Sequence, residues 1–268
     1  MSLLADHLNL APATLDRARQ LHREGTITLL AVSGKLASGK DTIAAATMAE
    51  LGHTDVVHFS YADAIKDEVD QIIATTRGTA AGTAAAQVAA TQQVDAADAE
   101  LMVNLLAAEA AADPTLHARR RTPGVRAALQ HWGTQVRRTQ DPDYWVKRSV
   151  SAAVATAAQG QSVFYTDVRF PNEVAWLADV GFCTVRVDVT ADTQAQRLRA
   201  RDGLLPDPGT VTHASETALD DYDRFDLRIS NDGPLDATVS AVVAGLTAAR
   251  TATEPAVRTA AVHNTAEL

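Results

Sequence analysis

The sequence predicts an α/β fold built on a five-stranded parallel sheet. Five short runs rich in apolar and β-branched residues are typical of buried strands. They are Thr26–Ser33, Val56–Ser60, Val163–Asp167, Cys183–Val189 and Leu227–Ser230. Helical patterns separate these runs, and strands that alternate with helices indicate βαβ units with right-handed crossovers. We therefore expect three layers, with helices on both faces of a single sheet.

Composition limits the class of protein. The chain has 268 residues, of which 46% are hydrophobic, enough for a sizeable core near the upper size of one domain. The net charge of -9 provides no sequence-wide basic surface, so polymeric nucleic acid is not an expected partner. A single cysteine, Cys183, excludes an internal disulfide framework. No apolar run reaches the roughly 20 residues of a membrane helix, so we expect a cytoplasmic protein without a membrane partner.

The first predicted strand continues into a loop bracketed by glycines, "SGKLASGKDT" (33–42), and a helical pattern follows. Gly34, Gly39 and Lys40 match G-x-x-x-x-G-K in the strand–loop–helix context that this phosphate-binding motif requires. Glycines allow consecutive backbone N–H groups to face phosphate oxygens, and the following helix offers its positive N-terminal end. Lys40 adds a mobile charge. The alternative is a glycine-containing turn without a ligand.

Asp41 follows Lys40 at the position where the common pattern has a Ser or Thr that reaches Mg²⁺. A carboxylate there would hold the metal directly or through water, and it is also favoured at a helix N-terminus. Asp41 is therefore a metal candidate, with helix capping as the alternative. Lys35, between the two glycines, would either screen the outer phosphates or lie in solvent.

Three later stretches concentrate charged and aromatic residues. They are "WGTQVRRTQDPDYWV" (132–146), "DVRFPNE" (167–173) and the stretch from "HASE" to "FDLRISNDG" (213–233). The second leaves a predicted strand at the carboxyl edge of the sheet, where open α/β folds bind ligands. Arginine suits bidentate contact with phosphate. We expect Arg137, Arg138 and Arg169 to hold an acceptor phosphate, with an ordinary surface arginine as the alternative for each.

These four motifs together resemble the deoxynucleoside monophosphate kinases of bacteriophages, a branch of the P-loop nucleoside monophosphate kinase fold. The resemblance runs, with gaps, from about Thr28 to Leu246. An aspartate after the loop lysine is usual in that family. The resemblance implies that ATP, with Mg²⁺ as cofactor, phosphorylates a deoxynucleoside monophosphate. A small-metabolite kinase of the phosphomevalonate kinase type is an alternative, because those enzymes share a G-K-D loop. An ATP-binding regulatory or assembly protein is an alternative of another class.

The resemblance assigns residues to three groups. ATP would contact Ser33, Gly34, Lys35, Ala37, Ser38, Gly39, Lys40, Asp41, Thr42, Asn231 and Gly233. The monophosphate would contact Asp63, Lys66, Trp132, Arg137, Arg138, Asp143, Trp145, Asp167, Arg169, Asn172 and Glu173. The catalytic residues would be Lys40, Arg169, Arg197 and Arg201, and Asp41 and Asp167 would hold Mg²⁺. For Trp132 and Trp145 the alternative is a place in the core. For Asp63 and Lys66, and for Arg197 and Arg201, the alternative is an exposed helix face.

The expected organisation has three parts. Residues 1–25 form an N-terminal helical extension, residues 26–248 form the kinase domain, and residues 249–268 are expected to be disordered because they are small, polar and aperiodic. Within the domain, residues 61–160 form a helical acceptor-binding region with an Ala-rich insertion, and residues 192–215 form a lid. A homodimer is compatible with this organisation.

Overall fold

The computed structural model describes residues 3–120, 122–203 and 213–251. The chain divides into two compact units. Unit 1 comprises Met1–Phe59 and Val150–Leu268, and unit 2 comprises Ser60–Ser149.

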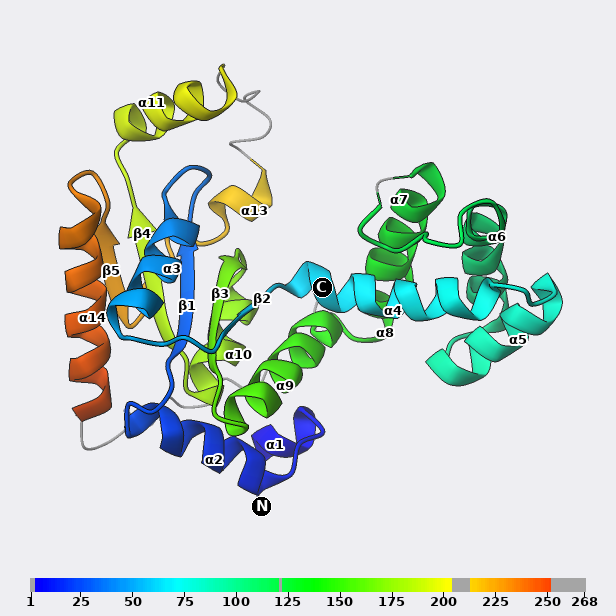
Figure 1. The fold of residues 1–268 in the computed structure, drawn as a ribbon, viewed down its shortest axis with the longest axis horizontal. Helices are drawn as coiled ribbons and strands as arrows, with labels where there is room; N and C mark the ends of the chain where they lie inside the picture. Colours follow the sequence, from blue (N-terminus) through cyan, green and yellow to red (C-terminus); the bar gives the residue numbers. More distant parts are fainter. Residues whose placement is uncertain (1–2, 121, 204–212, 252–268) are drawn as a thin grey trace. The chain divides into compact units, whose positions relative to one another are not determined.

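Unit 1 contains one sheet whose five strands are all parallel, in the order β2-β3-β1-β4-β5 (Figure 1). The strands are β1 (Leu29–Gly34), β2 (Val56–Phe59), β3 (Ser162–Val168), β4 (Cys183–Asp188) and β5 (Leu227–Ser230). The predicted fold class is therefore confirmed. The first strand begins later than predicted, because the N–H groups of Thr26 and Ile27 turn back to the Leu21 carbonyl.

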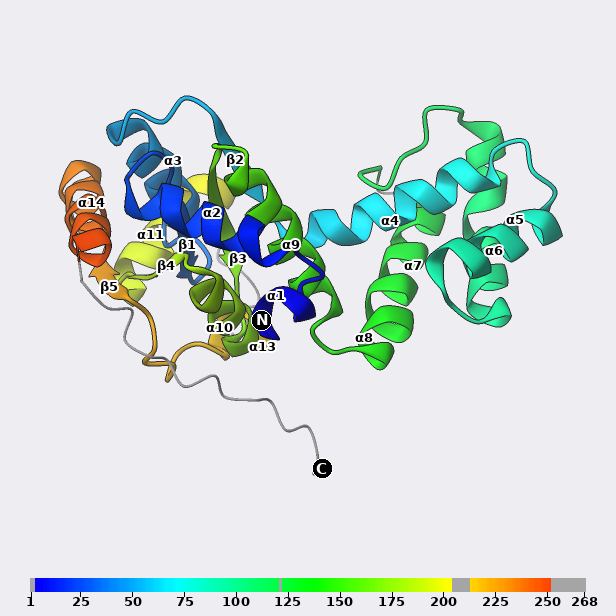
Figure 2. The same cartoon turned by 90° about the horizontal axis from the view of Figure 1, so that it is seen from below.

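Helices cover both faces of this sheet. Helices α3 (Lys40–Glu50) and α14 (Leu235–Thr251) pack against each other on one face, and α10 (Pro171–Val180) lies on the other (Figure 2). The core under α3 and α14 joins Ile43 and Leu246 to Val32 and Val185 of the central strands. None of the helices in the described ranges combines the length and the apolarity needed to cross a membrane.

The N-terminal segment and the end of α14 belong to unit 1. Residues 3–23 form α1 (Leu3–His7) and α2 (Pro12–Arg23), which follows the sequence prediction of a helical extension. The predicted tail begins too early, because α14 continues to Thr251 and the Arg250 guanidinium donates to the Ile27 carbonyl at 3.1 Å. The remaining residues of that tail, 252–268, lie outside the described residues.

A buried histidine of α2 contacts the start of β1. The ring nitrogen Nδ1 of His22 accepts the N–H of Leu29 at 3.2 Å, and the residue is only 8% exposed. Burial first, and then the nearby positive charge of Arg250, lowers the pKa of His22 from 6.5 to about 4. The folded chain therefore holds this ring neutral.

The carboxyl ends of the five strands meet at one edge of the sheet. Figure 1 shows the loop between β1 and α3 at this edge, together with α11 (Ala191–Asp202) and the short helix α13 (Ala214–Thr217). Residues 204–212 of the predicted lid lie outside the described residues. This edge brings together the residues considered below.

Unit 2 is helical. Its elements are α4 (Tyr61–Thr76), α5 (Ala81–Gln92), α6 (Ala96–Ala112), α7 (Pro123–Gln130), the π-helix η1 (His131–Val136), α8 (Arg137–Gln140) and the start of α9 (Tyr144–Ala158). The Ala-rich insertion forms α5 and α6, and Asp95 caps α6 by accepting the N–H of Asp98. Met102, Leu106 and Trp132 are central to the core of this unit.

The π-helix η1 has a packing role. A π-helix uses i→i+5 hydrogen bonds and is rare. The indole N–H of Trp145 donates to the carbonyl of Gly133, inside η1, at 2.9 Å. This contact joins η1 to the first turn of α9 in the core of unit 2.

Candidate functional site

The loop between β1 and α3 has the backbone geometry of a phosphate cradle. Ala37 and Gly39 adopt left-handed backbone angles, with φ of 59° and 87°. A side chain does not fit at Gly34, because a Cβ there would clash with Ser38 Oγ and lie 2.8 Å from the Val187 carbonyl oxygen. The sequence motif therefore corresponds to a turn that requires its first glycine for space and its second for conformation.

The carboxyl half of this loop, Gly39 to Asp41, presents donors without acceptors. The N–H groups of these residues, which precede or open α3, have no hydrogen-bond acceptor among the described residues. Lys40 is 9% exposed, and its ammonium makes no hydrogen bond or ion pair within the described part of the chain. Lys40 is buried, whereas Gly39 is half-buried and Asp41 is exposed. The first N–H groups of a helix have no acceptor within the helix, and together with the Lys40 ammonium they could bind an anion.

Several charges influence Lys40. Burial lowers the pKa of its ammonium below the ordinary value of 10.5, and the positive charges of Arg169 and Arg201 act in the same direction. The carboxylates of Asp41 and Glu216 act in the opposite direction. A bound phosphate would compensate the desolvation of this group, because it would supply the counter-charge at hydrogen-bond distance.

Asp41 is held by the neighbouring strand. The hydroxyl of Thr166, in β3, donates to Asp41 Oδ1 at 2.5 Å, and His58 Nε2 lies 2.9 Å from the same hydroxyl. Since Thr166 gives its only proton to the carboxylate, His58 must be the donor in the second contact. The His58 ring also stacks on Phe164, with ring centroids 4.5 Å apart.

The donor set at Asp41 suits Mg²⁺. One carboxylate oxygen is oriented by Thr166, and Oδ2 has no hydrogen-bond partner among the described residues. The described residues contain no group of three or more His, Cys, Asp or Glu side chains that would hold a metal alone. Mg²⁺ typically takes one or two carboxylates, with water and substrate phosphates completing its shell. Asp41 fits that mode, and the predicted second ligand, Asp167, is the penultimate residue of β3.

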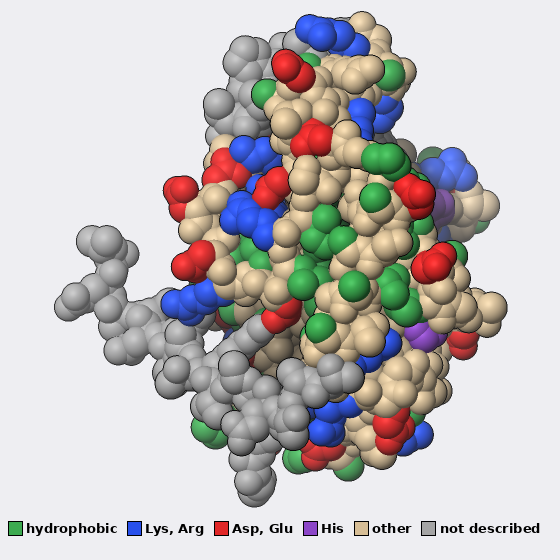
Figure 3. All heavy atoms as spheres, turned by 90° about the vertical axis from the view of Figure 1, so that its left-hand side faces the viewer, with side chains coloured by type: hydrophobic (Ala, Val, Ile, Leu, Met, Phe, Trp, Pro, Cys, Tyr) green, Lys and Arg blue, Asp and Glu red, His purple; other side chains and the backbone are tan. Residues whose placement is uncertain are grey.

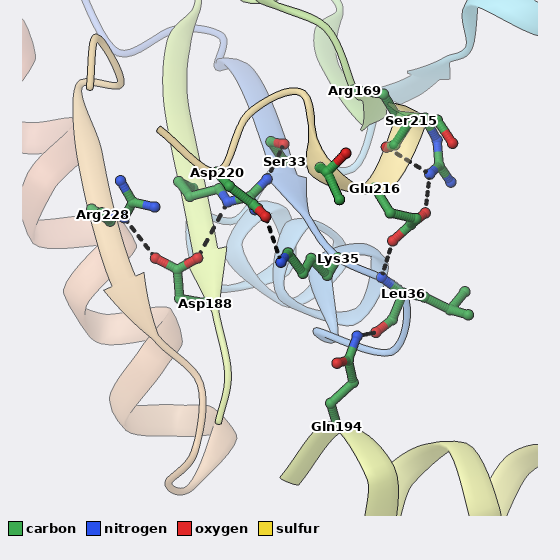
Figure 4. A network of polar contacts seen from close by, with 12 residues as sticks. Ser33, Lys35, Leu36, Arg169, Asp188, Gln194, Ser215, Glu216, Asp220 and Arg228 are labelled. Carbon is green, nitrogen blue, oxygen red and sulfur yellow. Dashed lines mark hydrogen bonds and ion pairs between the residues drawn. The ribbon is translucent and has the colours of Figure 1, made fainter. Parts of the chain in front are cut away.

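The amino half of the loop, Lys35 and Leu36, is already occupied by carboxylates. Lys35 Nζ forms an ion pair with Asp220 at 2.8 Å, and the Leu36 N–H donates to Glu216 Oε2 at 2.8 Å (Figure 4). Gln194 in α11 donates to the Leu36 carbonyl, also at 2.8 Å. Lys35 is thus tied to a carboxylate of its own chain, a role that the sequence analysis does not anticipate.

Arg169, at the end of β3, is held through its guanidinium and its backbone. Its guanidinium Nη1 donates to Glu216 Oε1 and to the Ser215 carbonyl at 3.4 Å, and its backbone N–H donates to Glu173 Oε2 at 2.6 Å. Glu173 also accepts the N–H of Phe170, so it caps α10 and is buried, which corrects its predicted contact with a monophosphate. Asn172 lies on the first turn of α10 and is half-buried.

A buried arginine lies beneath the loop. Arg186 of β4 is 3% exposed and donates to Ser33 Oγ, to Asp188 and to Asp220, each at 3.2 Å. Asp188 also pairs with Arg228 of β5 at 2.7 Å. Figure 4 shows the contact of Lys35 with Asp220 and that of Asp188 with Arg228. The amino half of the loop therefore belongs to a continuous network of alternating charges.

The loop is also held at the carbonyl of Ser38, the residue before Gly39. This oxygen accepts the amide of Asn231 at 2.8 Å and Arg197 Nη1 at 3.2 Å. Arg197 Nη2 donates to the Asn231 carbonyl at 2.7 Å. Arg197 therefore contacts the backbone of the loop and of the "NDG" turn, and its role on the transferring phosphoryl group stays a prediction.

The other residues predicted for ATP and the lid are placed as follows. Ser33 is buried and donates to the Val168 carbonyl at 2.8 Å. Thr42 and Gly233 are exposed. Arg201 is exposed at the end of α11 and pairs with Asp202 at 2.7 Å.

Unit 2 separates the predicted acceptor residues into buried and exposed groups. Trp132 and Trp145 are at most 1% exposed and belong to the core, so neither ring offers a base-stacking surface. Arg137 is 4% exposed; it donates to Glu68 Oε2 at 3.0 Å and its Nη1 donates to the Gln92 carbonyl at 2.9 Å. These contacts correct the predicted binding roles of all three residues.

Glu68 is the centre of this buried cluster. Its carboxylate is 1% exposed and accepts from the Trp132 indole at 2.8 Å and from the Tyr144 hydroxyl at 2.5 Å, besides Arg137. Arg148 lies 3.1 Å from its Oε1. Burial, followed by the contact with Glu68, raises the pKa of Tyr144 to about 12, so this hydroxyl remains a proton donor to the carboxylate.

The remaining predicted acceptor residues lie on or near the surface of unit 2. Asp63 pairs with Lys66 at 2.9 Å and with Arg119 at 3.2 Å. Arg138 is exposed, although it neighbours the buried Arg137 in sequence, and Asp143 is half-buried. Among the arginines of this motif, Arg138 is therefore the accessible cation.

Charge is mixed on the face of unit 1 that carries α14. Figure 3 shows acidic and basic side chains interspersed there, with apolar side chains between them. The described part of this face therefore has no extended basic stripe of the kind that follows a nucleic-acid backbone.

No family model matches the chain. A segment of 101 residues is 36% identical to "Uncharacterized protein ORF77" of Ictalurid herpesvirus 1 (strain Auburn). The match covers 37% of this chain and 39% of the viral protein's length. The similarity is therefore partial on both sides, and it carries no activity to this chain.

Proposed function

We propose that this protein is an ATP-dependent kinase that converts a deoxynucleoside monophosphate to the diphosphate. The observation that carries the proposal is the loop with unpaired donors, Gly39 to Asp41 with the Lys40 ammonium, at the carboxyl edge of a parallel sheet. Such a loop supports binding of the donor's phosphates. The class of acceptor is supported by the motif resemblance alone.

Arg169 supports the presence of a second anion. Its Nε and Nη2 hydrogens have no acceptor among the described residues, so one edge of the guanidinium is available for two oxygens of a monophosphate. In the proposed reaction an oxygen of the monophosphate attacks the γ-phosphorus of ATP. The bond from that phosphorus to the β,γ-bridging oxygen breaks, and ADP leaves with the electron pair.

The residues would act chiefly by positioning and by cancelling charge. The loop N–H groups and Lys40 hold the phosphates of the donor, and Arg169 orients the acceptor phosphate. Asp41, and Asp167 if it also reaches the ion, would hold Mg²⁺, which neutralises charge on the phosphates when bound.

A coupled assay of ADP release across the deoxynucleoside monophosphates tests the proposal. We expect turnover with at least one of them, and Lys40→Ala should abolish it while the melting temperature is retained. Release of ADP with phosphomevalonate but no nucleoside monophosphate would favour the small-metabolite kinase. Binding of ATP without any acceptor-dependent turnover would favour a regulatory or assembly protein.

Arg169→Ala distinguishes the acceptor side from the donor side. Loss of one charge-assisted contact costs roughly 1.5 to 3 kcal/mol, or about 10- to 150-fold in kcat/KM for the monophosphate. Affinity for ATP should change little, and Arg169→Lys should recover only part of the loss. If Arg169→Ala weakens ATP binding and spares the monophosphate, Arg169 belongs to the donor site.

A further inference from the structure

Glu216 joins two parts of the site that are distant in sequence. One oxygen of its carboxylate accepts the N–H of Leu36 in the loop, and the other accepts Nη1 of Arg169 at the end of β3 (Figure 4). Its side chain is 9% exposed, against 34% for that of Arg169. A bridging carboxylate that is largely shielded from water holds its partners more strictly than a surface ion pair does.

The bridge leaves the anion-binding groups free. Glu216 engages only Nη1 of Arg169, so Nε and Nη2 remain available on one edge of the guanidinium. In the loop it engages Leu36, whereas the unpaired donors belong to Gly39, Lys40 and Asp41. Glu216 therefore contacts the half of the loop formed by Lys35 and Leu36. It does not occupy the half formed by Gly39 to Asp41, where we place the phosphate.

We propose that Glu216 is a positioning residue that orients the Arg169 guanidinium relative to the phosphate loop. A long arginine side chain loses considerable rotamer entropy when it is fixed, and Glu216 fixes it before any ligand arrives. The same carboxylate ties Arg169 to the loop, so the two anion-binding elements keep one mutual arrangement. This inference deepens the proposed function and rests on it for its kinetic test.

The kinetic test compares Glu216→Gln, Glu216→Asp and Arg169→Ala in a double-mutant cycle. Glu216→Gln should lower kcat/KM for the monophosphate by about 10-fold, because a neutral amide orients a guanidinium poorly. Affinity for ATP should stay within about twofold of the parent protein. Combined with Arg169→Ala, Glu216→Gln should add less than about twofold, because it acts through the same guanidinium. Glu216→Asp keeps the charge and should restore part of the loss.

Asp226→Asn is the matched control. Asp226 also accepts a backbone N–H, that of Thr184 at 2.8 Å, but it does so at the amino end of β4, away from the loop. Kinetics toward the monophosphate should be unchanged in this variant. An equal loss in Asp226→Asn and Glu216→Gln would mean that Glu216 contributes only general stability, and it would overturn the proposal.

A second measurement on the ligand-free protein is independent of kinase activity. The Leu36 amide should exchange with deuterium faster in Glu216→Gln than in the parent protein, and the Nη signals of Arg169 should broaden or shift in NMR spectra. Unchanged exchange and unchanged signals would refute the bridge itself. If these changes occur but no acceptor is ever phosphorylated, the positioning contact stands and the proposed function fails.

One outcome would assign Glu216 the opposite role. If Glu216→Gln bound pyrophosphate or ATP more than about tenfold more tightly, the carboxylate would be competing with the ligand's phosphates. That result would refute positioning, because the contact would then have to break when phosphate binds.

Discussion

Arg137→Ala should destabilise unit 2, although the sequence makes Arg137 and Arg138 equivalent candidates for phosphate binding. The guanidinium of Arg137 lies 4.8 Å from the ring centroid of Trp132 and 4.6 Å from that of Tyr144, in contact with the buried Glu68. Its removal would leave that carboxylate without its buried cation. An ion pair broken in this way costs roughly 3 to 5 kcal/mol.

The expected loss lies near the lower end of this range. Glu68 keeps the indole of Trp132, the hydroxyl of Tyr144 and the partly exposed Arg148 as partners. We therefore expect the free energy of unfolding of unit 2 to fall by about 3 kcal/mol. Arg137→Lys should recover only a part, since a single ammonium cannot reach both Glu68 and the Gln92 carbonyl as the planar fork does.

Tryptophan fluorescence in urea measures this loss in unit 2 alone. A Trp176→Phe background removes the tryptophan of unit 1 and leaves Trp132 and Trp145 as reporters. Arg138→Ala is the control, and its free energy of unfolding should stay within about 0.5 kcal/mol of the background because its side chain is exposed. If Arg137→Ala and Arg138→Ala unfold at the same urea concentration, the buried pair does not stabilise unit 2 and our reasoning is wrong.

Three further predictions concern unit 1. His22 should make the chain less stable by about 3 kcal/mol between pH 6.5 and pH 4, because its pKa is about 4 when folded and 6.5 when unfolded; the unfolded chain takes up the proton first, so stability falls as pH falls. Urea titrations at several pH values measure this slope, and a slope unchanged in His22→Gln would contradict it. Gly34→Ala should abolish ATP binding in calorimetry, because its methyl group would clash with Ser38 Oγ; normal affinity would show that the loop adapts. Thr166→Val should weaken Mg²⁺-dependent ATP binding by about 10-fold while binding without Mg²⁺ changes little, because it frees Asp41 from its hydrogen bond; equal losses with and without the metal would argue against a role for Asp41 in holding it.

Local patterns in the sequence were sufficient for the sheet and for the loop. The alternation of apolar strands with helices predicts the parallel sheet, because the inner strands β1, β3 and β4 are largely buried and read as apolar runs. The spacing of Gly34, Gly39 and Lys40 places the loop, since the positive φ of Gly39 and the close approach of Gly34 to Ser38 are local properties. Both inferences depend on residues close together in the chain.

The partners of the loop could not be predicted, because they come from distant segments. Glu216 and Asp220 lie about 180 residues after the loop, and neither has a local sequence signal that links it to Lys35 or Leu36. The motif "HASE" offered the one available hint for Glu216. Arg186 stands in an apolar strand, where its charge was the signal of a buried polar network.

Burial within unit 2 was also beyond the sequence. Arg137 and Arg138 are adjacent and identical in type, but they differ in exposure because one faces Glu68 and the other faces solvent. The two tryptophans carry the same ambiguity, since an indole suits both a core and a stacking surface. Only the packing of η1 and α9 decides between these possibilities.

The π-helix makes unit 2 tolerant of one change in chain length at this point. Its i→i+5 hydrogen bonds accommodate one residue more than an α-helix does for about the same rotation. Deletion of a single residue between His131 and Val136 would therefore allow an uninterrupted α-helix from α7 into α8, and the residues beyond would keep roughly their directions, with Arg137 still facing Glu68. The same deletion inside the regular helix α6 would turn everything beyond it by about 100° about the helix axis. A frame-preserving deletion is therefore expected to be less damaging in η1 than in α6.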